Sequence, residues 1–257
     1  MIKKGEHTLI QAKKQDVRVA LITGAARRIG AETAHTLHAA GFKVAIHCHQ
    51  SQKDAQQLAS QLNHLRADSA FVFTEDLLQL TVQSKLVKQV IDWAGQLDLL
   101  VNNASLFIRN ELQTFNQDEW AAQFAVNVQA PYLLSLLARP FLKKQQGSII
   151  NITDIHAVYP LKGYSVYCQT KAALVAQTKA LAKEFAPDIR VNGVAPGAIA
   201  WPEKENAMSE KIQAKIIERT ALKRHGNPHY IAQTVLALAD NPFISGQIIN
   251  VDGGRYI

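Results

Sequence analysis

The sequence has few cysteines and no apolar run long enough to span a membrane. Cys48 and Cys168 are the only cysteines in 257 residues, too few for a disulfide framework. No stretch approaches the roughly 20 consecutive apolar residues of a transmembrane helix. Residues 1–7 lack the apolar segment of a secretory signal. We therefore expect a cytoplasmic protein without membrane association.

Long basic runs are absent as well, although the formal net charge is +7. Lysines and arginines occur in short pairs such as Arg27-Arg28 and Lys143-Lys144, without interleaved aromatic residues. Surfaces that bind nucleic acid need clustered cations and stacking platforms. The positive charge is therefore expected to attract an anionic cofactor and substrate, and no nucleic-acid partner is predicted.

Apolar, β-branched runs alternate with amphipathic stretches from residue 17 onward. Such runs are typical of parallel strands buried on both faces by amphipathic helices. No internal repeat or low-complexity linker interrupts the alternation. Residues 17–257 are therefore expected to form a single α/β domain, a Rossmann-type doubly wound parallel sheet of about seven strands with helices on both faces. The expected strands are 17–23, 43–47, 70–73, 97–101, 148–152, 189–194 and 246–251, and the expected helices 29–40, 54–65, 82–94, 118–143, 165–184 and 229–239.

Three segments depart from this alternation. Residues 1–16 are expected to form a poorly ordered extension. The helical stretch 118–143 is expected to be interrupted near Pro131, because proline disrupts a helix interior. Residues 198–210 are irregular, and long irregular insertions are often mobile lids, so we expect a substrate lid there.

A loop of small residues joins the first expected strand to the first expected helix. Gly24 and Gly30 allow the backbone to approach a pyrophosphate, whose charge a helix N-terminus stabilises. A strict G-x-G-x-x-G pattern is absent, so the loop alone is also consistent with a tight turn. Arg28 stands where glycine is more usual, and its guanidinium is suited to bind a phosphate or another anion.

The end of the second expected strand lacks the acidic residue that binds a free ribose 2′-hydroxyl. His47, His49 and Ser51 supply donors and potential cations there, which favours NADPH over NADH. A zinc site at these histidines and Cys48 is not favoured, because strand alternation turns Cys48 away from them. We therefore predict NADPH as the cofactor and no metal.

Further polar residues follow the third and fourth expected strands. Asp76 and Leu77 are expected to contact adenine, and Asn103, Ala104 and Ser105 to lie where ligands bind beyond the carboxyl ends of strands. An asparagine at this position can also serve only its own turn. Asn127 interrupts an otherwise apolar helical stretch, where it either marks a kink or holds a water.

Asp154, Tyr167 and Lys171 form the most informative pattern. Tyr167 and Lys171 are four residues apart and share one face of the expected helix. The lysine ammonium is expected to lower the pKa of Tyr167 from its usual value of about 10. Asp154, thirteen residues before Tyr167, would add a second proton donor or acceptor. Alone, a Tyr-x-x-x-Lys pair is also typical of an exposed helix, so the assignment depends on the other motifs.

Together these motifs resemble the short-chain dehydrogenase/reductase family. The resemblance implies that Tyr167 donates or accepts a proton, Lys171 holds the nicotinamide ribose and lowers the pKa of Tyr167, and Asn127 positions a water for proton relay. It also implies a homotetramer and places Ile29, Pro196 and Gly197 at the cofactor. The residues that carry it are Thr23-Gly24, Ile29-Gly30, Asn102-Asn103-Ala104, Asn127, Tyr167, Lys171, Pro196-Gly197 and Val251-Asp252-Gly253-Gly254.

Asp154 departs from the family pattern, which usually has a serine at this position. An anionic carboxylate repels a developing alkoxide, whereas a carboxyl group suits a substrate with basic ring nitrogens. With Arg28, the residues around His47 and Phe107, this departure resembles the pteridine reductase branch of the family, which includes dihydromonapterin and alternative dihydrofolate reductases.

The branch resemblance implies NADPH-dependent reduction of a dihydropterin or dihydrofolate to the tetrahydro form. It implies that Asp154 serves the 5,6 bond, directly or through water, and that Tyr167 with Lys171 serves the 7,8 bond if oxidised pterins are accepted. The implied substrate contacts are Arg28 and Ser105 at the pterin edge, Phe107 stacked on the ring opposite the nicotinamide, and Tyr164 lining the same pocket.

Two other functions remain open. One is a generic carbonyl or 3-oxoacyl reductase with an unusual aspartate. The other is a non-catalytic NADP-sensing or RNA-binding protein, because a fold does not guarantee activity. The intact Asn127, Tyr167 and Lys171 favour an enzyme. Gln50 leaves open how strictly NADPH is preferred, and the residues do not choose among dihydrofolate, dihydrobiopterin and dihydromonapterin.

Overall fold

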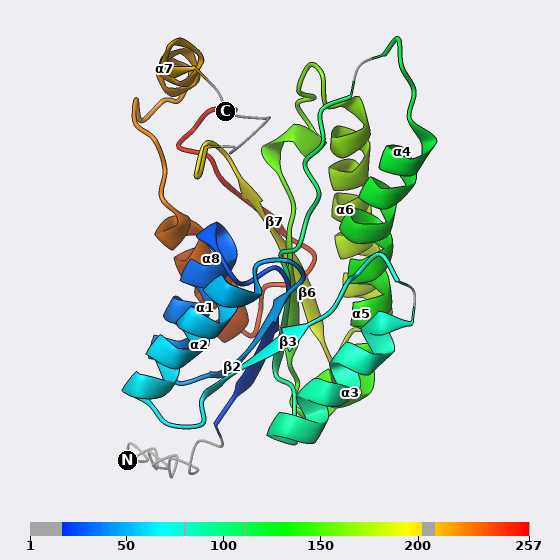
Figure 1. Cartoon of the computed structure of the whole chain (residues 1–257), viewed down its shortest axis with the longest axis vertical. Coiled ribbons are helices and arrows are strands. Elements are labelled where there is room, and N and C mark those ends of the chain that lie inside the picture. The colour runs from blue at the N-terminus through cyan, green and yellow to red at the C-terminus, as the bar shows by residue number, and fades with distance from the viewer. Residues whose placement is uncertain (1–16, 80, 111, 202–208, 257) are drawn as a thin grey trace, which may run out of the picture.

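Seven parallel strands form the centre of the computed structural model, which describes residues 17–79, 81–110, 112–201 and 209–256. The strand order in the described chain is β3-β2-β1-β4-β5-β6-β7, and every neighbouring pair is parallel (Figure 1). This confirms the predicted doubly wound sheet. The strands are β1 Val19–Ile22, β2 Lys43–Cys48, β3 Ala70–Thr74, β4 Leu99–Asn102, β5 Ser148–Ile152, β6 Arg190–Pro196 and β7 Ile248–Val251.

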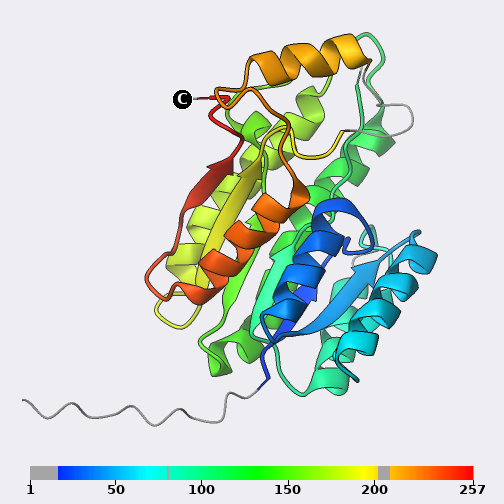
Figure 2. The ribbon, with the colours of Figure 1, turned by 90° about the vertical axis from the view of Figure 1, so that its left-hand side faces the viewer.

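Helices cover both faces of the sheet (Figures 1 and 2). One face carries α1 (Arg28–Ala39), α2 (Gln52–Leu65) and α8 (Pro228–Asp240). The opposite face carries α3 (Val82–Ala94), α4 (Gln117–Phe124), α5 (Ala130–Lys144) and α6 (Ser165–Glu184). Helix α7 (Glu210–Glu218) stands apart, above the ends of the strands where the chain approaches its C-terminus.

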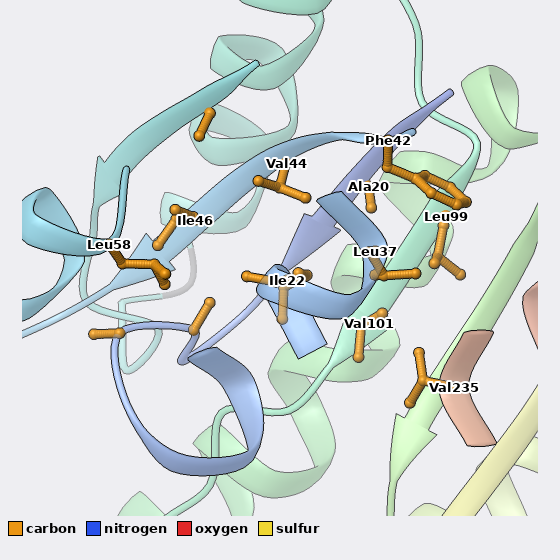
Figure 3. Close-up of a cluster of buried hydrophobic side chains, with 14 of the residues drawn as sticks. Ala20, Ile22, Leu37, Phe42, Val44, Ile46, Leu58, Leu99, Val101 and Val235 are labelled. Atoms are coloured by element: carbon orange, nitrogen blue, oxygen red, sulfur yellow. The ribbon is translucent and has the colours of Figure 1, made fainter. Parts of the chain in front are cut away.

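Alternate residues of each central strand enter two separate cores. In β1, Ala20 and Ile22 pack under α1 and α8, whereas Val19 and Leu21 pack under α3 and α5. All four are at most 1% exposed. Figure 3 shows the first core, where Ile22 lies close to Leu37. Burial on both faces explains why the strands appear in the sequence as continuous apolar runs.

The strand order reverses at β1, which pairs with β2 on one side and β4 on the other. The chain after β1 turns into α1 on one face, and the chain after β4 leads to α4 on the other (Figure 1). A reversal of this kind leaves a crevice beyond the carboxyl ends of the strands, where ligands of open α/β sheets bind. The fold therefore places the site between the β1 and β4 loops.

The expected break near Pro131 is a π-helical turn, Ala125–Gln129, that joins α4 to α5. Pro131 lies in the first turn of α5 and cannot donate a hydrogen bond to the carbonyl of Asn127, four residues earlier. The helix is therefore wider immediately before the proline. Asn127 lies inside this wide turn and is 1% exposed.

Sequence reasoning missed α7, and part of the expected lid is described. Ile212 and Ile216 have helical spacing, but no residue of α7 is buried, so its apolar signal is weak. Ala198–Trp201 are described, whereas residues 202–208 and the expected extension 1–16 lie outside the described residues. No helix among the described residues is long and apolar enough to cross a membrane.

Leu37→Ala tests the first core. Leu37 is fully buried in α1, so the substitution should lower the free energy of unfolding by about 2–5 kcal/mol. Leu65→Ala, at the end of α2 where the side chain is 73% exposed, should change it by less than about 0.5 kcal/mol. Urea denaturation of both variants checks this; equal losses would contradict the described packing.

Candidate active site

A cavity of about 590 Å³ lies at the carboxyl ends of the strands. It extends from the loop after β2 to the chain after β7, and loops after all the strands contribute to its wall. The residues predicted from the sequence that line it are Gly24, Arg28, Ile29, Gly30, His47, His49, Ser51, Asp76, Leu77, Asn103, Ala104, Ser105, Phe107, Asp154, Tyr167, Lys171, Pro196 and Gly197. Asn127 and Tyr164 are the two predicted residues absent from this wall.

The β1 loop is packed directly against the β4 loop. Gly24 has φ +61°, and a Cβ there would lie 2.9 Å from the Ala104 Cα. Asn103 Nδ2 donates to the carbonyl oxygens of Thr23 (2.8 Å) and Gly24 (2.9 Å). The Asn103 side chain therefore fixes the glycine loop and does not merely serve its own turn. Gly30 lies beneath, where a Cβ would be 2.4 Å from the Gly24 carbonyl oxygen.

Arg28 connects this loop to the chain that follows β6. It has φ +56°, the left-handed region that glycine adopts without strain, which fits its position in a glycine loop. Its Nη2 donates to the carbonyl oxygens of Ala200 (2.8 Å) and Trp201 (3.1 Å). The Trp201 ring stacks on His225 at 4.4 Å. Arg28 therefore joins two walls of the cavity.

His47 has a structural role that sequence reasoning did not predict. Its Nδ1 accepts from the Gly24 N–H (3.2 Å), so the ring hydrogen is on Nε2, which donates to the Glu75 carbonyl (3.1 Å). Burial lowers the pKa of His47 to about 4. The ring is neutral at physiological pH, with both nitrogens engaged. This corrects the expectation that His47 offers a cation to a phosphate.

Other groups at this end of the cavity remain suited to an anion. Ser51 is the N-cap residue of α2, but its hydroxyl does not bond to the backbone N–H groups of the first turn. The N-terminus of a helix favours an anion. His49 is half exposed, with Nε2 3.9 Å from Asp76. Arg27, which sequence reasoning missed, also lines the cavity, and its Nε is 3.7 Å from the Asp54 carboxylate.

At the opposite end, Asp154 and Tyr167 share a hydrogen bond. The Tyr167 hydroxyl donates to Asp154 Oδ2 at 2.7 Å, and the His156 N–H donates to Oδ1 at 2.8 Å. Burial raises the pKa of Tyr167 well above its ordinary value, and the Asp154 charge and hydrogen bond raise it further. This direction is opposite to the lowering expected from Lys171, whose influence on Tyr167 stays a prediction.

Lys171 is fully buried next to this pair. Its Nζ donates to the Ile152 carbonyl oxygen at 2.9 Å and lies 5.7 Å from the centre of the Tyr167 ring. Burial lowers the pKa of Lys171 to about 8, against a smaller opposing effect of Asp154. Burial thus favours the neutral form of both Lys171 and Tyr167.

Asn127 holds the β4 loop against α6. Its Oδ1 accepts from the Leu106 N–H (2.7 Å), and its Nδ2 donates to the Leu106 carbonyl (2.9 Å) and to Thr170 Oγ1 (3.0 Å). Both amide hydrogens are therefore used within the protein. A water held by Asn127 for proton relay stays a prediction, and it would need another atom of this residue.

Phe107 and Tyr164 differ in their relation to the cavity. Phe107 lines the wall, stacks on Tyr164 at 4.2 Å and 10°, and meets the edge of Tyr167 at 4.7 Å. Tyr164 is 6% exposed and lies behind Phe107, which corrects the expectation that it lines the pocket. Its ring instead supports Phe107 as a flat, apolar wall.

Sequence reasoning missed several wall residues besides Arg27. His156 and Ile216 come from short elements without a motif, and Arg255 follows the Val251–Gly254 motif. Only the neighbouring motif could have drawn attention to Arg255. Among the described residues, no group of three or more histidines, cysteines or acidic residues could hold a metal ion.

The sheet and its cavity define a dinucleotide-binding α/β oxidoreductase, and comparison with known proteins identifies the family. The model described as Enoyl-(Acyl carrier protein) reductase matches residues 24–255. The chain therefore belongs to the short-chain dehydrogenase/reductase family, as its motifs indicated.

Curated relatives and solved structures cover nearly the whole chain. The 3-oxoacyl-[acyl-carrier-protein] reductase of Synechocystis sp. is 34% identical over 92% of this chain and 96% of its own. The 3-oxoacyl-[acyl-carrier-protein] reductase of Thermotoga maritima is 33% identical over 93% of this chain and 98% of its own. FolM alternative dihydrofolate reductase 1 from Brucella canis, complexed with NADP, has a TM-score of 0.85 and 34% identity, covering 93% of each chain. A blue fluorescent protein from a metagenomic library, in complex with NADPH, has a TM-score of 0.88 and 28% identity, covering 95% of this chain and 100% of its own.

The buried Lys171 predicts a pH-dependent stability. Its folded pKa of about 8 lies below the ordinary 10.5, so between these values the unfolded chain binds a proton that the folded chain lacks. The free energy of unfolding should therefore rise with pH there, by about 1.4 kcal/mol per pH unit at most. Urea denaturation of wild type and Lys171→Met from pH 8 to 9.5 checks this. The free energy of unfolding of the wild type should rise relative to that of the variant as the pH increases. If the two free energies change with pH in parallel, the pKa of Lys171 is not lowered.

Proposed function

We propose that this protein is an NADPH-dependent pterin reductase that converts a dihydropterin or dihydrofolate to the tetrahydro form. The observation that carries the proposal is the Asp154 carboxylate, which faces the cavity and accepts the Tyr167 hydroxyl at 2.7 Å. The family usually has a serine at this position. A carboxyl group can pass a proton to a basic ring nitrogen, a step that a pterin requires.

The wall suits NADPH at its β1 and β2 end. Gly24 and Gly30 let the β1 loop pack against the β4 loop at the N-terminus of α1, where a pyrophosphate would bind. The Ser51 hydroxyl, which makes no capping hydrogen bond, and the Arg27 guanidinium would hold a 2′-phosphate. Lys171 would hold the nicotinamide ribose. When bound, NADPH supplies the hydride. The NADP and NADPH complexes of the similar structures support this assignment.

Reduction of one carbon–nitrogen double bond adds one hydride to the carbon and one proton to the nitrogen. Asp154 would first take up a proton from water and then deliver it to the ring nitrogen, directly or through a second water. Tyr167 keeps its own proton at neutral pH, because its pKa lies well above the ordinary value, and its hydroxyl orients Asp154 Oδ2. The Phe107 ring, backed by Tyr164, would hold a flat pterin by stacking.

A second candidate is 3-oxoacyl reduction, which the names of the relatives from Synechocystis sp. and Thermotoga maritima favour. Asp154 disfavours it for a physical reason. Reduction of a ketone develops negative charge on the carbonyl oxygen, and an adjacent carboxylate destabilises that charge. The FolM structures, which are similar to this chain at 34% identity, support the pterin alternative.

Asp154 variants test the proposal. Asp154→Ala and the isosteric Asp154→Asn should lower kcat/KM for dihydrobiopterin by about 10²–10⁴, because both remove the proton donor. The Kd for NADPH, measured by fluorescence titration, should change less than about threefold, since Asp154 makes no contribution to the β1 and β2 end of the cavity. Asp92→Asn, on the exposed face of α3, is the matched control.

Two results would contradict the proposal. One is undiminished dihydrobiopterin turnover in Asp154→Ala. The other is a wild-type enzyme that reduces an acetoacetyl thioester faster than dihydrobiopterin or dihydrofolate. The second result would establish the 3-oxoacyl alternative.

We further propose that the protein is a homotetramer, in which α4, α5 and α6 of two copies pack together. These helices flank an apolar groove of about 590 Å³, and Tyr132 and Leu136 are 44% and 39% exposed beside it. Large apolar side chains exposed together are typical of protein interfaces. The groove is lined by Trp120, Ala121, Phe124, Ala125, Val128, Gln129, Tyr132, Ala173, Gln177, Ala180 and Leu181.

Val128→Glu tests this assembly, because it introduces a charge into the groove. Sedimentation velocity should show a tetramer for the wild type and smaller species for the variant, with an unchanged far-ultraviolet circular dichroism spectrum. Leu65→Glu, on the exposed end of α2, should remain tetrameric. A monomeric wild type, or a tetrameric Val128→Glu, would contradict the assembly.

A further inference from the structure

The chain after β7 turns back onto the wall of the cavity. Gly253 and Gly254 have φ +68° and +73°, which lets the backbone reverse within two residues. The Asp252 carboxylate fixes the reversal, because Oδ1 accepts from the Gly254 N–H (2.9 Å) and Oδ2 from the Tyr256 N–H (3.3 Å). Arg255, between these two anchored residues, is thereby held at the cavity.

This tail lies at the Asp154 end of the cavity. The Tyr256 ring stacks on Tyr159 at 3.9 Å and 10°, and meets the His156 ring edge-on at 6.4 Å. His156 in turn donates its N–H to Asp154. Contacts therefore run continuously from Arg255 to the carboxylate, so the arginine is at the substrate end of the cavity and away from Ser51.

The Arg255 guanidinium forms no ion pair with another described residue. It lies 5.4 Å from the centre of its neighbour's ring, Tyr256. The two carboxylates closest along these contacts, Asp154 and Asp252, already accept two hydrogen bonds each from other donors. Arg28, on the loop after β1, donates to backbone carbonyls. Among the described side chains, Arg255 thus presents an uncompensated cation to the cavity.

We propose that Arg255 is a specificity-determining residue that binds a carboxylate on the side chain of the substrate. The proposal rests on the proposed function and sharpens it: the preferred substrate is a folate-type dihydropterin, whose glutamyl group is anionic, rather than a pterin with a neutral side chain. A guanidinium binds a carboxylate through two parallel charge-assisted hydrogen bonds. On a cavity wall this attraction is screened less than on an open surface.

Arg255→Gln separates the two substrate types. The experiment measures kcat/KM for dihydrofolate and for dihydrobiopterin with saturating NADPH. The ratio of the two constants should fall at least fivefold in the variant, mainly through a higher KM for dihydrofolate, and Arg255→Lys should recover part of the loss. Arg219→Gln, in the exposed chain just after α7, removes a cation without touching the cavity wall and should leave the ratio unchanged.

Three outcomes overturn the proposal. An equal fall for both substrates would show that Arg255 only shapes the tail. An unchanged ratio would show that the carboxylate is bound elsewhere, and an equal loss in Arg219→Gln would show general charge attraction. If the wild type turns over dihydrobiopterin, the proposed function stands whatever the ratio does. If it turns over neither substrate, both proposals are wrong.

Discussion

The hydrogen bonds between the β1 and β4 loops are the constraint on which the rest of the site depends. The Thr23 hydroxyl accepts the N–H groups of Asn103 (2.9 Å) and Ala104 (3.0 Å), and Asn103 returns two bonds to the glycine loop. These bonds cross the point where the strand order reverses. They hold the β1 and β4 loops against each other, and therefore fix the middle of the cavity wall. Because the two loops touch, a Cβ at Gly24 would lie 2.9 Å from the Ala104 Cα, so position 24 has no space for a side chain.

At the substrate end, the chemistry follows from a competition between desolvation and charge. Tyr167 and Lys171 are both buried, and burial favours the neutral form of each. Asp154 adds a negative charge that supports the ammonium but opposes a phenolate. The result is a phenol that keeps its proton and a carboxylate that receives it as a hydrogen bond. If a serine replaced Asp154, the negative charge would be lost, and the pKa values of Tyr167 and Lys171 would change.

The sequence predicted the features that depend on local spacing. The parallel sheet is confirmed, and the glycine loop and the Tyr167–Lys171 pair lie on the cavity wall, where their roles stay predictions. Sequence reasoning failed where a side chain is used by a distant partner. His47 bonds to groups 23 and 28 residues away, and Lys171 donates to a carbonyl 19 residues before it, so neither role is visible in a motif. Tyr164 was misplaced because the same helical turn directs one tyrosine to the cavity and the other behind Phe107.

Arg28 has a consequence for how ligands influence one another. Its guanidinium lies on the cofactor loop but donates to Ala200 and Trp201 on the far wall. An anion that bound through Nη2 would compete with those two carbonyl groups, whereas one that bound through Nε or Nη1 would leave both bonds in place. In the first case the binding free energies of ligands on the two sides of the cavity would be linked, and by thermodynamic reciprocity each ligand would change the affinity of the other by the same factor. The nitrogen that an anion uses therefore decides whether Arg28 couples the two walls.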